Sequence, residues 1–96
     1  MRNDYRATPL HIACRYHSNN VVKFLLTLYE IDINAQNIYG NTPLHEASRN
    51  NNREIVKDLL GLRCINTTIE NKDGSTAYYM TDDSKIHNLL DELMNK

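Results

Sequence analysis

The chain has 96 residues, of which 41% are hydrophobic and 24% charged, and its formal net charge at pH 7 is -1. This length suits one domain, and the charge balance argues against a nucleic-acid partner or an anionic membrane surface. The first residues lack the apolar core of a signal peptide, and no apolar stretch is long enough to span a bilayer. Cys14 and Cys64 are too few for a disulfide framework, so we expect two reduced thiols and a cytoplasmic protein.

Two parts of the sequence recur with a period of 34 residues. Ala-Thr-Pro-Leu-His-Ile-Ala at 7–13 corresponds to Asn-Thr-Pro-Leu-His-Glu-Ala at 41–47, and a weaker third copy begins at Thr76. An apolar pattern recurs in phase with it, and its third copy, Ile86 to Leu90, comes four residues early. A period of this length predicts stacked repeats rather than one compact core.

Each unit is predicted to contain two short helices followed by an extended loop, which we call a finger. Thr8 and Thr42 are suited to cap the first helix, because each precedes a proline whose missing N–H costs nothing at the first helical position. The second helix has the apolar spacing of an inward-facing stripe. The residues of this stripe are Val21, Val22, Leu25 and Leu26, then Ile55, Val56, Leu59 and Leu60. Neither helix pair can bury its apolar side alone, so the units must stack.

The pattern Gly-x-Thr-Pro-Leu-His at 40–45, followed by the apolar helix and a turn rich in Asp and Asn, resembles an ankyrin repeat. The resemblance covers about residues 3–94 and implies an all-α solenoid of three helix-turn-helix units joined by finger loops. We expect one domain over 1–96, with repeats at about 3–36, 37–70 and 71–96.

Three residues depart from this pattern where the family has glycine. Arg6 lies in the first finger, and His17 and Asn51 lie between the helices of units one and two. Asn and His are enriched among non-glycine residues with left-handed backbone, so the inter-helix turns can form without glycine. Gly40 and Gly74 are placed where the finger turns require a positive φ.

The third unit departs most. Ala-Tyr-Tyr replaces Pro-Leu-His, so we expect Tyr78 in the core place of Leu44 and Tyr79 in the place of His45. Four residues are expected to be missing between its helices, and its polar outer side suits a terminal capping repeat.

The first unit shows no comparable polar cap. We expect Leu10, Ile12 and Val22 to leave an open apolar end. That end could serve self-association as a weak dimer or pack on a partner, or the chain could be the C-terminal part of a longer ankyrin array.

No combination of residues predicts an active site, a metal site or a cofactor site, so we expect no enzyme. A nucleophilic site needs a base beside the nucleophile, whereas Cys14 occupies a packing position and Cys64 lies in a finger connection. The resemblance implies that His11 and His45 fix the finger of a neighbouring unit by hydrogen bonding. Together with Cys14, His11 and His17 have a spacing that zinc could use, but a fourth ligand is missing.

The resemblance implies that partners bind at the finger tips and at the exposed side of the first helix of each unit. The candidate partner-binding residues in that register are Tyr5, Arg6, Arg15, Tyr16, Ile38, Tyr39, Asn41 and Arg49. Tyr and Arg are enriched at interface hot spots, although a finger tyrosine can instead pack on its neighbour and an arginine can be a solvated charge. We therefore expect a protein–protein interaction module, monomeric or weakly dimeric. The short array and asparagine-rich composition also suit a host-directed effector, located in host cytoplasm or nucleus.

Overall fold

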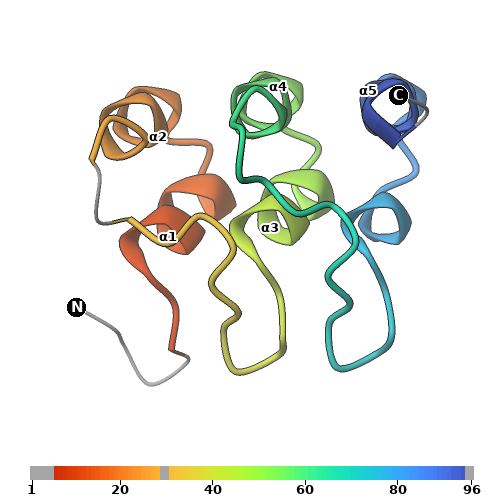
Figure 1. Cartoon of the computed structure of the whole chain (residues 1–96), viewed down its shortest axis with the longest axis horizontal. Coiled ribbons are helices and arrows are strands. Elements are labelled where there is room, and N and C mark those ends of the chain that lie inside the picture. The colour runs from red at the N-terminus through yellow and green to blue at the C-terminus, as the bar shows by residue number, and fades with distance from the viewer. Residues whose placement is uncertain (1–5, 29–30, 95–96) are drawn as a thin grey trace.

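The computed structural model describes residues 6–28 and 31–94 of the chain (Figure 1). The described residues contain helices and no strand, which confirms the all-α prediction. The elements in chain order are α1 (Pro9–Arg15), α2 (Asn19–Leu25), α3 (Pro43–Arg49), α4 (Arg53–Leu60), the 3-10 helix η1 (Ala77–Met80) and α5 (Ser84–Met94). None of the helices in this part of the chain is long and apolar enough to cross a membrane.

The helices form two rows, with the fingers below them (Figure 1). The inner row contains α1, α3 and η1, and the outer row contains α2, α4 and α5. Each inner helix packs on the next inner helix, and α4 packs on both α2 and α5. Buried Leu, Ile, Val and Ala side chains from all three units form one core cluster between the rows, as the stacking argument predicts.

The two Thr-Pro-Leu-His segments make the same contacts in both copies. His11 Nδ1 accepts hydrogen bonds from Thr8 N (3.1 Å) and Thr8 Oγ1 (2.9 Å), and Thr8 Oγ1 caps the first turn of α1. His11 Nε2 donates to the Asn41 carbonyl in the next finger (2.7 Å). His45 repeats this arrangement and donates to the Ser75 carbonyl (2.8 Å). The predicted role of both histidines in fixing a neighbouring finger is confirmed.

The turns have the left-handed backbone that the sequence indicates. Gly40 and Gly74 have φ of 79° and 78°. Arg6, His17 and Asn51, which replace glycines, have φ of 57°, 59° and 56°. Residues with a side chain therefore occupy three positions where glycine costs least.

The first helical segment of the third unit differs from those of the other two. Ala77 is fully buried, whereas Tyr78 is only partly buried and stacks on His87 with 4.1 Å between ring centroids. Tyr79 follows the register of His45 but is 75% exposed. The expectation that Tyr78 fills the core place of a leucine is therefore met only in part.

Three residues, rather than the expected four, are missing between the helices of the third unit. Asp83 Oδ1 accepts a hydrogen bond from Ile86 N (3.2 Å), as Asn52 Oδ1 does from Ile55 N (3.1 Å). These helix starts are 31 residues apart, which is three fewer than the repeat period.

The open apolar end exists, but its composition differs from the prediction. Leu10 and Val22 are fully buried because they point between the helix rows, whereas Ile12 is partly exposed as expected. Val21, predicted to face inward, is exposed because no unit among the described residues stacks on this side of it, while its equivalent Ile55 is buried. We call the exposed apolar set the N-terminal face. It consists of Ile12, Val21, Phe24 and Leu28.

Candidate functional site

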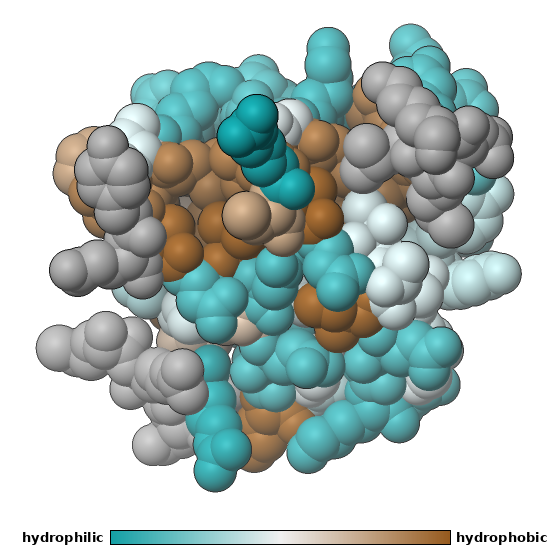
Figure 2. Space-filling model, viewed as in Figure 1, coloured by the Kyte–Doolittle hydropathy of each residue, from teal (hydrophilic) through white to brown (hydrophobic). Residues whose placement is uncertain are grey.

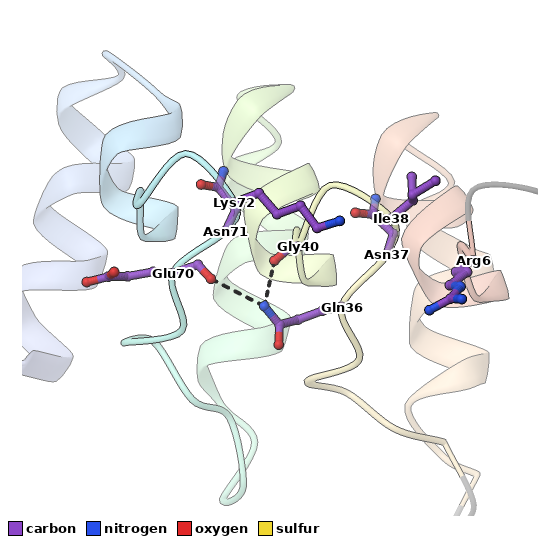
Figure 3. A pocket seen from close by; sticks show the side chains of 8 residues that line it. All are labelled: Arg6, Gln36, Asn37, Ile38, Gly40, Glu70, Asn71 and Lys72. Atoms are coloured by element: carbon purple, nitrogen blue, oxygen red, sulfur yellow. Dashed lines mark hydrogen bonds between the residues drawn. The ribbon is translucent and has the colours of Figure 1, made fainter.

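With the loop before α1 counted as the first finger, the second finger (32–41) and the third finger (66–75) are joined by backbone and side-chain hydrogen bonds. Lys72 N donates to the Tyr39 carbonyl (3.0 Å). The Gln36 side-chain amide donates to the carbonyls of Gly40 (2.9 Å) and Glu70 (3.3 Å). These bonds border an open hollow of about 490 Å³ between the fingers (Figure 3). These hydrogen bonds therefore hold the two fingers in a fixed position relative to each other.

Two asparagines shape the finger turns. Asn37 Oδ1 accepts hydrogen bonds from Tyr39 N (2.9 Å) and Asn41 N (3.0 Å), and Asn71 accepts the equivalent pair two and four residues on. Both side chains are buried. Sequence reasoning missed these residues, although each lies three residues before a finger glycine, at the same offset in both units.

Asn41 is a structural residue, which corrects its selection as a partner-binding candidate. It is 4% exposed. Its carbonyl accepts from His11, its Oδ1 accepts from Asn71 Nδ2 (2.9 Å), and its Nδ2 donates to Glu46 (3.4 Å). The contacts with His11 and Asn71 hold neighbouring units together and the contact with Glu46 lies within the second unit, so the side chain is not available to a partner.

The other finger and helix candidates lie at the surface. Tyr16 is 68% exposed and Tyr39 is 52% exposed, and Ile38 and Arg6 are also exposed. Arg6 and Lys72 lie on either side of the finger that carries Ile38 (Figure 3). The surface of this finger region is mostly hydrophilic in the view of Figure 2. Tyr5 lies outside the described residues, so its selection stays a prediction.

A buried carboxylate connects the two arginine candidates. Glu46 is fully buried, and its Oε1 lies 2.9 Å from Arg49 Nη2 and 3.5 Å from Arg15 Nε. Its Oε2 accepts from Asn37 Nδ2 at 3.3 Å. The sequence contained a signal for Glu46, because a glutamate stands where the first unit has Ile12.

The remaining titratable groups fit a structural role. Burial, and to a lesser degree the charge of Glu46, raises the pKa of Cys14 to about 12, so its thiol is inert at neutral pH. Burial also lowers the pKa of His11 and of His45. Among the described residues, no group of three or more His, Cys, Asp or Glu side chains could hold a metal ion. What this surface offers chemically is recognition by shape, aromatic area and charge.

Comparison with known proteins agrees with this description. The family model of ankyrin repeats (3 copies) matches residues 1–73, which is more than half of the chain. A search of curated proteins found no match to the chain. Ankyrin repeats are generally modules that bind other proteins and have no enzymatic activity. With this match, and with Thr-Pro-Leu-His segments that cap helices and tie fingers together, the chain belongs to the ankyrin-repeat family.

Proposed function

We propose that the chain binds a segment of another protein across its fingers and the exposed side of α1 and α3. The observation that carries this proposal is the exposure of Tyr16, Ile38 and Tyr39 on a scaffold whose neighbouring fingers are tied together. Large side chains held on a rigid support bind at low entropic cost. We assign partner contact to Arg6, Arg15, Tyr16, Ile38, Tyr39 and Arg49, and call this set the groove.

The test is quantitative affinity capture from a eukaryotic cell lysate, comparing the wild type with a Tyr16→Ala/Tyr39→Ala variant. Truncation of a hot-spot residue costs about 2 kcal/mol or more, and tyrosine is enriched among hot spots, so we expect a partner to be lost or strongly reduced. Tyr79→Ala is the matched control, because Tyr79 is an exposed tyrosine outside the groove. Equal capture by all three proteins would contradict the groove assignment, provided that circular dichroism shows all three folded.

We also propose a second function, weak self-association through the N-terminal face. Phe24 is 63% exposed, and Figure 2 shows hydrophobic surface at the α2 end of the molecule. The equivalent positions Ile55 and Asp58 meet the first unit, and Lys23 Nζ lies 2.9 Å from Asp58 Oδ2. The N-terminal face is therefore the repeat of a surface that stacks within the chain. The occupant that we propose is the same face of a second copy, because two self-complementary patches meet across a two-fold axis.

Head-to-tail stacking is a poorer match, because over residues 84–92 of α5, where side-chain exposure is described, the exposed residues are polar: Ser84, Lys85, Asn88 and Glu92. Analytical ultracentrifugation over a range of protein concentrations tests this second proposal. We expect the wild type to dimerise at high concentration and Phe24→Asp, which introduces the residue of the equivalent position 58, to stay monomeric. Tyr79→Asp at the other end is the control. A wild type that is monomeric at the highest concentration would refute self-association.

A further inference from the structure

Glu46 is a fully buried carboxylate at the junction of the first two units. Moving a carboxylate out of water is costly unless it is paired and hydrogen-bonded. Its Oε2 accepts from Asn37 Nδ2 (3.3 Å) and Asn41 Nδ2 (3.4 Å), and its Oε1 accepts from Arg49 Nη2 (2.9 Å). Arg15 Nε approaches the same Oε1 to 3.5 Å. The carboxylate is therefore enclosed by groups that hold it in one place.

The two arginines come from equivalent positions of adjacent helices, α1 and α3. Their side chains remain 28% exposed for Arg15 and 47% exposed for Arg49. One buried negative charge faces two positive charges, so the cluster of Glu46, Arg15 and Arg49 carries one positive charge in excess. A guanidinium has five N–H donors. Glu46 engages Arg49 through a single hydrogen bond, and Arg15 Nε makes none within the part of the chain described here. Arg15 Nε itself is buried, so the donors that remain for a ligand are the other guanidinium N–H groups of these two partly exposed side chains.

Two further cations lie on the fingers. Arg6 and Lys72 stand on either side of the Ile38 finger, and the Glu70 side chain points away from that finger (Figure 3). Asp73 is the other exposed carboxylate on the third finger.

The outer helices present a different charge pattern. There Lys23 pairs with Glu54 (3.4 Å) and Asp58 (2.9 Å), and Arg53 pairs with Asp83 (3.0 Å). Lys23 and Arg53 of the outer row are thus matched by exposed or partly exposed carboxylates. The arginines of the inner row share one carboxylate that no solvent reaches.

We propose that the groove selects an acidic protein segment, and that Arg15 and Arg49, positioned by Glu46, bind its Asp or Glu carboxylates. This inference rests on the groove proposed above. A guanidinium binds a carboxylate through two parallel hydrogen bonds, which gives direction as well as attraction. Glu46 restricts both side chains before a ligand arrives, which reduces the entropy lost on binding. Tyr16, next to Arg15 in the chain, supplies aromatic contact area beside the charges.

The probe is a phage-displayed library of random peptides, selected against the full chain, with selected peptides then measured by fluorescence polarisation. We expect Asp and Glu to be enriched over the unselected library, and affinity to fall as salt is raised. Arg15→Gln and Arg49→Gln are tested singly, because each leaves Glu46 with one arginine partner. Each variant should weaken binding about tenfold. Lys57→Gln, on the exposed side of α4, makes the same change in net charge outside the groove and should leave the affinity unchanged.

The outcomes separate this inference from the groove itself. Selected peptides without acidic enrichment that lose binding on Tyr16→Ala/Tyr39→Ala would overturn acidic selection and leave the groove standing. Peptides whose binding responds neither to those tyrosines nor to the arginines would overturn both. Failure to select any peptide would also overturn the inference, since it requires a linear acidic segment to suffice for binding.

Discussion

Gly40 and Gly74 offer a direct test of how the fingers stabilise the array. Both have nearly the same positive φ, 79° and 78°. A Cβ placed on Gly40 would lie 2.8 Å from Lys72 N and 3.0 Å from Asn71 Cα, whereas a Cβ on Gly74 meets nothing within 4 Å. The two glycines share a conformational requirement, and only Gly40 has a neighbouring backbone against it.

The magnitudes follow from this difference. Gly74→Ala should lower the free energy of unfolding by about 1–2 kcal/mol, which is the cost of a left-handed alanine. Gly40→Ala adds an overpacking cost of about 1–3 kcal/mol, because backbone rather than a flexible side chain must retreat. The retreat also stretches the bond from Lys72 N to the Tyr39 carbonyl, worth about 1 kcal/mol. We therefore expect Gly40→Ala to be about 2–4 kcal/mol less stable than Gly74→Ala.

Urea denaturation followed by far-UV circular dichroism measures both variants. Asparagine variants separate the two contributions, because asparagine tolerates left-handed backbone, as Asn51 does in this chain. Gly74→Asn should be close to the wild type, while Gly40→Asn should keep most of its loss. Equal losses for Gly40→Ala and Gly74→Ala would refute the reasoning that the fingers press against each other at this glycine.

Three further predictions use the same scaffold. In the native protein DTNB should label the exposed Cys64 quickly and the buried Cys14 only on unfolding; a fast thiol remaining in Cys64→Ser would contradict this. Because burial lowers the pKa of His11 and His45 below the usual 6.5, the unfolded chain binds more protons as the pH falls through this value. The free energy of unfolding should therefore decrease from pH 7 to pH 5, by at most about 1.4 kcal/mol per pH unit for each histidine, and an unchanged urea midpoint would refute it. Arg6→Gly, which relieves a left-handed arginine with φ of 57°, should raise stability by about 1 kcal/mol in the same denaturation assay while weakening partner capture.

The sequence was sufficient for the helices of the first two units because their signals are local. A capping threonine, a following proline and an apolar helical spacing act within one unit, and they predicted α1 and α3 with their caps at Thr8 and Thr42. The role of His45 also followed, since the family resemblance implies its bond to the next finger. In the third unit the local signals are weakened, and Tyr79, which stands in the histidine register, is exposed rather than bonded to a finger.

The candidate site was predicted less completely, because burial at a finger depends on the neighbouring unit. The family resemblance places Asn41 among the partner-binding candidates, yet its amide is enclosed by Asn71 and Glu46 from outside its own turn. Val21 has the spacing of an inward residue, but nothing in the described chain precedes it to cover it. The spacing of apolar residues assigns a residue to a side of its helix. Whether that side is buried depends on the repeat unit that stacks against it.

Ile12 and Glu46 occupy equivalent positions of the repeat. They show how the dependence of burial on the neighbouring unit bears on the proposed functions. The side chain at this position faces the preceding unit, so Ile12 belongs to the N-terminal face while Glu46 meets Arg15 of α1. A glutamate at position 12 would have no equivalent of Arg15 within the described residues, and an isoleucine at position 46 would leave Arg15 and Arg49 without their shared anion. The repeat thus places residues 12 and 46 at equivalent positions of α1 and α3. In the functions proposed above, the residue at this position decides whether that part of the array is an apolar docking face or the support of a charged groove.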